Sequence, residues 1–316
     1  MPQLRIKKQG LVKTAFGSII RYVFLLAYGY VILYPIVFLI VNSLKGPADY
    51  FDPTVQWVPK TATLWNYQFV MDALKFWESL FNTFFIQLLG GLLEIVSCAV
   101  AAYGLARFNF KGKRIFSGLM ILSILVPTTM IIIPSYVNFS YLDFFGVLGG
   151  IGRLVGHNLR PSIIDTPLVF WLPSVLGVGL KGGLFIYIYA QFFKGLPREL
   201  EEAAWIDGAG PWKAFLKVIV PSSGVAFVTV SLFAVVWHWN DYYLAQMYLS
   251  ESYPLSVRLA NLPDAIAATS GSDMSILNTG PVLMAGCVLV ILPLLVFYLL
   301  MQRKFIASIS NTGIVG

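Results

Sequence analysis

The chain has 316 residues, of which 58% are hydrophobic and 12% are charged, and its mean hydropathy is +0.76. A soluble fold of this length cannot hide that much apolar surface, so the composition excludes a soluble globular protein and indicates one embedded in lipid. The net charge of +7 comes from cations that flank apolar segments and form no separate basic domain, which argues against nucleic-acid binding.

Six apolar segments are long enough to cross a bilayer core, which takes about 20 residues of α-helix. Four contain no acidic or basic residue, and the other two contain one internal charge each, Glu94 and Lys181. The sequence therefore predicts an all-α membrane protein with six transmembrane helices. The predicted spans are, in chain order, 22–44, 79–106, 115–142, about 166–193, 218–240 and 274–302.

An even number of crossings places both ends of the chain on one side of the membrane. Most Lys and Arg residues flank the spans on that same side, so the positive-inside rule predicts that both termini are cytoplasmic. The first span is long and no small-residue cleavage site follows it, which indicates a retained helix and not a signal peptide. We expect a cytoplasmic N-terminal segment (1–21), a six-helix domain (22–302) and a cytoplasmic tail (303–316).

A polar segment at about 196–221 lies between the fourth and fifth predicted spans. The stretch from Glu199 to Trp205 predicts one short helix, and Asp207-Gly208-Ala209-Gly210 supplies turn chemistry. Pro211 is well placed as the first residue of a second helix, on which Phe215, Val218 and Ile219 share an apolar face. The segment is predicted to form a helix, a tight turn and a second helix on the cytoplasmic side.

The residue pattern of this segment resembles the EAA loop of binding-protein-dependent ABC importer permeases. The matching residues are Glu202-Ala203-Ala204, then Gly208, then Val218 and Pro221. Other anchors resemble the maltose-type carbohydrate branch of that family, with two modest departures, valines at 218 and 220 and a longer loop at 143–165. These anchors are Trp57-Val58-Pro59, Asn66-Tyr67, Asn82-Thr83, the run Ala101 to Arg107, Pro127, Pro134, Gln191-Phe192-Phe193, Trp239 to Tyr242 and Gln302 to Phe305. The alternative for the loop alone is an ordinary connector between membrane helices.

The resemblance implies a permease subunit of an ATP-driven carbohydrate importer in the bacterial cytoplasmic membrane. Such a subunit forms half of the translocation pathway and works with a second homologous permease, two ATP-binding subunits and an extracellular solute-binding protein. It also implies that the EAA-like loop couples to an ATPase subunit and that the tail reaches the ATPase dimer. The coupling residues would be Glu202, Ala203, Ala204, Asp207 and Gly208. No catalytic residue, metal or cofactor is expected in this chain, and the alternative is an importer permease for a non-sugar solute.

Sugar recognition should use aromatic faces and a few polar groups, because sugars present apolar ring faces and many hydroxyls. The competing interpretation is that Trp and Tyr near span ends anchor the helices at the membrane interface. The pathway candidates are Lys181, Tyr187, Trp237, Trp239, Asn240 and Asp241, with Trp171 and Tyr189 beside them.

The two charges inside spans need an explanation, because a lone charge at mid-membrane costs about 2.5 to 3.5 kcal/mol. We expect Glu94 and Lys181 to face the bundle interior. Three interpretations of Lys181 stand: it lines the sugar pathway, which we prefer, it bridges to Glu94, or it extends to the outer surface. Together with His238, these residues lie on three different predicted spans, which disfavours a membrane-embedded enzyme. The two histidines lack metal-ligand spacing, and Cys98 and Cys287 fall inside apolar spans, where we expect them to act as small hydrophobic residues and to form no disulfide.

Overall fold

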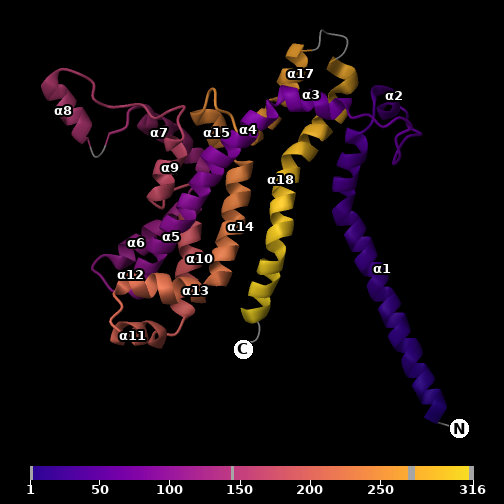
Figure 1. Ribbon diagram of the computed structural model, residues 1–316, viewed down its shortest axis with the longest axis horizontal. Helices are drawn as coiled ribbons and strands as arrows, with labels where there is room; N and C mark the ends of the chain where they lie inside the picture. Colours follow the sequence, from indigo (N-terminus) through magenta and orange to yellow (C-terminus); the bar gives the residue numbers. More distant parts are fainter. Residues whose placement is uncertain (1–2, 144–145, 270–274, 313–316) are drawn as a thin grey trace. The chain divides into compact units, whose positions relative to one another are not determined.

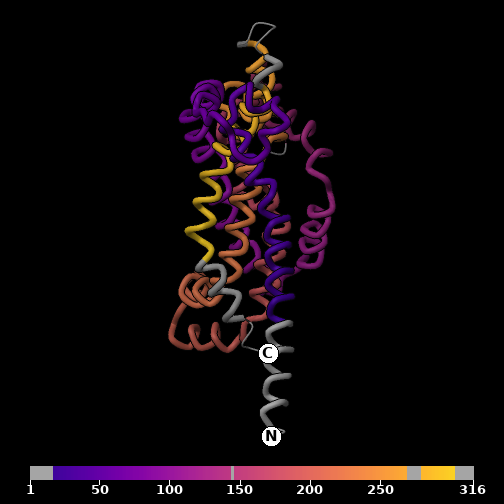
Figure 2. The backbone as a smooth tube through the Cα atoms, turned by 90° about the vertical axis from the view of Figure 1, so that its right-hand side faces the viewer, coloured from indigo at the N-terminus to yellow at the C-terminus, as the bar shows by residue number. Residues whose placement is uncertain are grey.

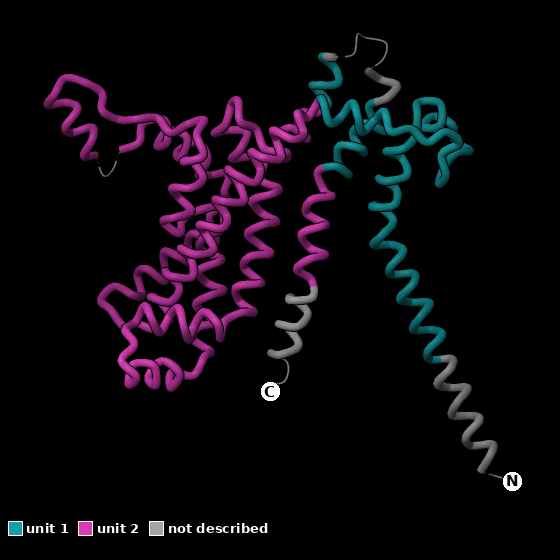
Figure 3. The backbone as a smooth tube through the Cα atoms, viewed as in Figure 1, with its two compact units in different colours: residues 1–72, 263–289 teal, residues 73–262, 290–316 magenta. Residues whose placement is uncertain are grey.

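The computed structural model describes residues 3–143, 146–269 and 275–312, and no β-strand occurs among them. The prediction of an all-α fold is therefore confirmed. The chain divides into two compact units, which Figure 3 colours separately. Unit 1 comprises residues 1–72 and 263–289, and unit 2 comprises residues 73–262 and 290–316.

Unit 1 contains the first long helix and an ordered outer segment. Its elements are α1 (Gln3–Ser43), α2 (Pro47–Tyr50), most of α3 (Trp65–Ala73), most of α17 (Leu262–Thr269) and the first part of α18 (Ser275–Thr312) (Figure 1). The Lys45 ammonium is buried and donates to the carbonyls of Val55 (2.7 Å) and Gln56 (3.1 Å). The amide of Asn66 donates to the carbonyls of Ser43 and Lys45. These contacts fold the segment after α1 back onto the end of that helix.

Unit 2 is built around α5 (Leu89–Arg107), which packs against α9, α10 and α14. Small residues on α5 such as Cys98 and Ala102 are fully buried and let large rings of α10, Phe185 and Tyr189, come close. The other elements are α4 (Phe76–Asn82), η1 (Thr83–Leu88), α6 (Lys113–Leu125), α7 (Thr128–Ser140), α8 (Val147–Val155), α9 (Leu168–Val175), α10 (Gly182–Gly195), α11 (Glu199–Ile206), α12 (Pro211–Ala214), η2 (Phe215–Ile219), α13 (Val220–Ser222), α14 (Gly224–Asn240), α15 (Tyr243–Tyr248), α16 (Leu255–Ala260) and the rest of α18.

Within the described residues, three helical stretches are long and apolar enough to cross a membrane: Gly17–Ser43, Phe76–Arg107 and Thr279–Gln302. Two bent pairs raise this number to at most five: α6 with α7, bent by 107°, and the segment Pro211–Ser222 with α14, bent by 81°. Three to five candidate spans are therefore established, and the count of six stays a prediction. The first bend falls at Pro127, which has no N–H to continue the ladder of α6.

The fourth and fifth predicted spans differ from the structure in their continuity. The fourth is two helices, α9 and α10, separated by residues 176–181, because Gly177 adopts a positive φ of 71° that ends the helical run. The fifth begins at Gly224 and not at residue 218, because the preceding turns, which contain Pro221, belong to the other arm of the 81° bend. Both breaks place irregular backbone inside segments that the hydropathy pattern reads as continuous.

The break between α9 and α10 is tightly packed, and this predicts an asymmetry between two glycines. A Cβ on Gly182 would overlap the carbonyl oxygen of Gly177 and lie 3.3 Å from Glu94 Oε1, whereas a Cβ on Gly104 in α5 has no neighbour within 4 Å. Gly182→Ala should therefore cost about 1–3 kcal/mol, and Gly104→Ala should be neutral or stabilise by up to about 1 kcal/mol. Thermal unfolding of the two variants in detergent tests this, and equal midpoints would contradict the close packing.

Candidate functional site

A buried carboxylate joins three elements in the middle of unit 2. Glu94 of α5 is fully buried, and its Oε2 lies 2.8 Å from Nε2 of His238 on α14, which is also buried. Its Oε1 accepts a hydrogen bond of 3.2 Å from the backbone N–H of Lys181, the last residue before α10. A carboxylate in an apolar interior needs such partners, because the charged form is costly without them. Glu94 thus fixes α5, α14 and the break between α9 and α10 at one point.

The Lys181 ammonium takes no part in this arrangement, so the alternative interpretation of a Glu94–Lys181 bridge does not describe the structure. Among the described residues, the Glu94 carboxylate contacts the His238 imidazole, and Lys181 reaches Glu94 through its backbone N–H. The ammonium instead lies 5.7 Å from the centre of the Trp237 ring, where a cation is attracted by the aromatic face. The structure therefore brings together two of the pathway candidates, Lys181 and Trp237.

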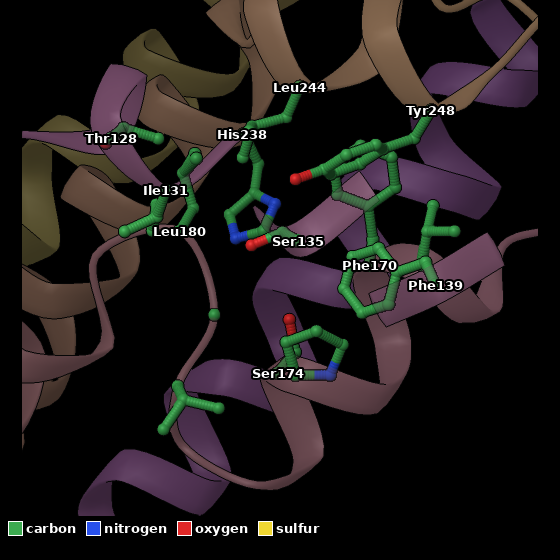
Figure 4. Close-up of a pocket in the computed structure, with 14 residues that line it drawn as sticks. Thr128, Ile131, Ser135, Phe139, Phe170, Ser174, Leu180, His238, Leu244 and Tyr248 are labelled. Atoms are coloured by element: carbon green, nitrogen blue, oxygen red, sulfur yellow. The ribbon is translucent and has the colours of Figure 1, made fainter. Parts of the chain in front are cut away.

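A cavity of about 80 Å³ opens beside His238, and Figure 4 shows the imidazole among the side chains that line it. Polar side chains that line it include Thr128, Ser135, Ser174 and Tyr248. Nδ1 of His238 and Oγ of Ser174 are buried and have no protein partner. Because unpartnered buried polar atoms are costly, this cavity suits water or the hydroxyl of a bound molecule.

The sequence did not single out His238 as a site residue, although the information to do so was present. An acid and a histidine on two apolar spans each need a partner, and pairing the two satisfies both requirements. Spacing along the chain does not indicate the pair, because 116 residues lie between the last residue of α5 and the first residue of α14. Only the packing of the helices brings the pair into contact.

The remaining pathway candidates scatter. Trp239 is buried and its indole N–H donates to the Val290 carbonyl (3.2 Å), Trp171 donates to the Ile86 carbonyl (3.2 Å), and Tyr189 is buried in the core. Tyr187 and Asn240 are exposed. None of these five contacts Glu94 or His238 through a described hydrogen bond, so they do not form one site with that pair.

Asp241 forms a second buried polar group just beyond the last residue of α14. Its carboxylate accepts from the Gln87 amide (3.3 Å) and from the backbone N–H of Leu244 (3.3 Å). Burial raises the pKa of Asp241 to about 6, because the charged form loses its hydration. The residue is 8% exposed, so its side chain fastens the end of the helix and presents little surface to a ligand.

The EAA-like segment forms the predicted helix, turn and helix. α11 ends at Ile206, Gly208 takes a positive φ of 78°, and α12 begins at Pro211. Glu202, Ala203, Asp207 and Gly208 are exposed and Ala204 is half-buried, while Phe215 and Ile219 are buried on the apolar face. In Figures 1 and 2, α11 and α12 lie at the end of unit 2 opposite α15. The segment is thus a polar surface element anchored by its second helix.

The buried acid of this segment is Glu201, which sequence reasoning passed over. Its Oε2 lies 2.8 Å from Arg107 Nε at the end of α5, and Tyr103 of α5 donates a hydrogen bond of 2.8 Å to its Oε1. The two charged side chains are 5% and 3% exposed. The residue pattern from Ala101 to Arg107 at the end of the second predicted span resembles the family, but only the tertiary structure shows that this run contacts the EAA-like segment.

Comparison with known proteins gives one consistent picture. A family model described as "Binding-protein-dependent transport system inner membrane component" matches residues 95–311. The chain is 30% identical over 292 residues to the trehalose transport system permease protein SugB of Mycobacterium tuberculosis, covering 92% of this chain and 95% of that one. It is 27% identical to the diacetylchitobiose uptake system permease protein NgcG of Streptomyces coelicolor, covering 92% and 87%. A solved bacterial ABC transporter for alginate import shares the fold, with a TM-score of 0.69 at 21% identity over 91% of this chain and 96% of that one.

The Glu94–His238 pair predicts strong non-additivity. Glu94→Met and His238→Leu should each destabilise by about 3–5 kcal/mol, because each leaves a buried polar partner unpaired, whereas the double variant should cost clearly less than the sum. Denaturant unfolding in detergent measures all three. The exposed pair Lys60–Asp52, at 62% and 29% side-chain exposure, serves as the control cycle and should show little coupling, because solvent screens the two charges. Additive effects at Glu94 and His238 would contradict the pairing.

Proposed function

The chain belongs to the family of binding-protein-dependent transport system inner membrane components, and from that premise we propose that it is a permease subunit of an ATP-driven carbohydrate importer. The observation that carries the sugar assignment is near full-length similarity to a trehalose permease and a diacetylchitobiose permease. The chain is a membrane subunit and not an enzyme, so ATP hydrolysis belongs to a partner.

Two features indicate the partners of this chain: its family and its exposed apolar residues. A second, homologous permease completes the translocation pathway, two ATP-binding subunits bind on the cytoplasmic side, and an extracellular solute-binding protein delivers the sugar. Apolar exposure supports the need for lipid and protein neighbours: within the stretch Gly17–Ser43, the most apolar window of 18 residues contains no buried residue. Both termini and the EAA-like segment lie in the cytoplasm in this proposal, as the distribution of Lys and Arg favours.

The EAA-like segment is the contact with the ATPase subunit. Its outward residues Glu202, Ala203, Asp207 and Gly208, with Ala204 at the edge, form a small polar surface that a partner groove can enclose. Large apolar side chains beside them, Ile206 (86% exposed) and Trp212 (62% exposed), add contact area that water leaves when a partner binds. The turn at Gly208 sets the angle between the two helices and therefore the shape offered to the partner.

The sugar pathway passes the break between α9 and α10. Lys181 and the Trp237 face lie there together, and a cation beside an aromatic ring is an arrangement that binds the hydroxyls and the apolar face of a sugar. The His238 cavity adds unpartnered polar atoms at the same break. A non-sugar solute is the alternative function, and the same residues would then meet a different ligand.

Uptake measurements decide between these functions. The chain is reconstituted with the permease, ATPase and binding protein that co-purify with it, and vesicle uptake of trehalose, diacetylchitobiose and an α-glucoside is compared with that of an amino acid and phosphate. ATP-dependent accumulation of a saccharide supports the proposal. Accumulation of only an amino acid or phosphate would overturn the carbohydrate assignment and leave the permease assignment in place.

Gly208 provides the test of the coupling contact. Gly208→Val should strongly reduce both ATPase docking and transport, because a β-branched residue is strained at a φ of 78° and its side chain enters the partner surface. Gly210→Ala is the matched control, since Gly210 has a φ of −73° and an open Cβ position. Co-purification of the ATPase and vesicle uptake measure the result, and normal transport by Gly208→Val would remove the segment from the proposed interface. Glu202→Ala should act in the same direction, with loss of ATP-driven uptake.

Lys181→Met tests the pathway. The variant keeps the length of the side chain and removes its hydrogen-bond donors, so uptake should fall at least several-fold while assembly with the ATPase stays intact. The substitution leaves the backbone N–H that donates to Glu94 in place, so the effect of removing the ammonium is measured without disturbing the hydrogen bond at the break. If uptake by Lys181→Met equals that of the unmodified transporter, Lys181 does not line the pathway.

A further inference from the structure

The EAA-like segment is fastened to α5 by a buried polar cluster whose members come from four places in the chain. Glu201 of α11 receives the Arg107 guanidinium on Oε2 and the Tyr103 hydroxyl on Oε1, each at 2.8 Å. Arg107 also donates from Nη2 to the Leu196 carbonyl at the end of α10 (3.0 Å). The Tyr103 hydroxyl lies 3.4 Å from the carbonyl of Pro211, the first residue of α12. One cluster therefore ties α5, α10, α11 and α12 together.

The burial of Glu201 separates it from the other acids of α11. Glu199 and Glu202 are exposed, whereas the Glu201 side chain is 3% exposed. A buried carboxylate paired with a buried guanidinium does not detach easily, because separation leaves two buried charges without water or a partner. The ring of Tyr103 also packs against Phe215 of η2, with the centroids 4.8 Å apart. Force applied to α11 or α12 therefore reaches α5 through charge, hydrogen bonds and ring packing at once.

Resting on the proposed function, we propose that Glu201 is the positioning residue that makes the EAA-like segment move as one body with α5. The exposed residues of the segment meet the ATPase, and Glu201, held by Arg107 and Tyr103, transmits their displacement to α5. Since α5 also carries Glu94, the displacement continues along one uninterrupted helix to the break beside Lys181. Glu201 touches neither ATP nor sugar and acts only through its contacts with α5.

The experiment measures whether α5 follows the segment. Spin labels are placed at exposed positions 109, just after α5, and 200, in the first turn of α11, in the assembled transporter without the half-buried Cys287. Their distance is recorded without nucleotide and with ATP and vanadate. In the otherwise unmodified complex we expect the same distance in both states. In Glu201→Gln we expect a broader distribution and a shift of several ångströms between the states, with ATP hydrolysis retained but sugar uptake per ATP reduced several-fold.

Two further variants keep the result decisive. Glu199→Gln, an exposed acid of the same helix, should behave like the unmodified complex. Tyr103→Phe removes the hydrogen bonds of the hydroxyl to Glu201 and to the Pro211 carbonyl but keeps the Arg107–Glu201 ion pair, so it gives a smaller shift in the same direction and serves if Glu201→Gln fails to assemble. Destabilisation alone would lower the amount of complex without making the distance depend on nucleotide.

The outcomes separate this inference from the function beneath it. A distance that is identical in both states in Glu201→Gln and Tyr103→Phe, within a complex that hydrolyses ATP, overturns the role of Glu201 alone. A distance that changes with nucleotide in the unmodified complex overturns it as well. Failure of the unmodified chain to bind any ATPase subunit overturns the proposed function and this inference with it.

Discussion

The packing of unit 2 depends on one buried carboxylate, that of Glu94. A carboxylate in apolar surroundings must have hydrogen-bond donors around it, because its charged form is costly without them. The partners of Glu94 are the imidazole of His238 and the backbone N–H of Lys181. A backbone N–H is free to donate sideways only where the helical ladder is interrupted, so the break before α10 and the buried acid explain each other. The glycines at the break fit the same geometry, because a Cβ on Gly179 would lie 2.7 Å from the Glu94 carboxyl carbon.

Another buried carboxylate, Glu201 of α11, meets the same requirement beside the end of α5. Glu201 is satisfied by Arg107 and Tyr103, and Arg107 reaches on to the end of α10. At roughly 1.5 Å per residue, the interval from Glu94 to Arg107 on α5 spans about 20 Å. Helix α5 thus connects the break between α9 and α10 with the EAA-like segment. A transporter that couples two distant events needs such a connection, and α5 is the element placed to provide it.

The cavity at His238 and the cation at Trp237 are consistent with passage of a polar solute past the break. Their polar atoms are few and their walls are apolar, which suits weak, reversible contact with a sugar. In the proposed transporter, a second permease and a binding protein also meet the sugar. For that reason, similarity to trehalose and diacetylchitobiose permeases indicates a class of substrate and not one compound.

Hydropathy and local pattern by themselves determined the all-α fold, the membrane location and the helix, turn and helix of the EAA-like segment, because each depends on residues close together in the chain. The left-handed turn at Gly208 and the helix start at Pro211 follow from single residues for the same reason. Only the tertiary structure decided that Glu94 pairs with His238 and not with Lys181, that Glu201 and not Glu202 is the buried acid, and that the fourth span is broken. A charge inside a span demands a partner without naming it, since the choice is made by which helices pack together and how far each backbone departs from the helical ladder.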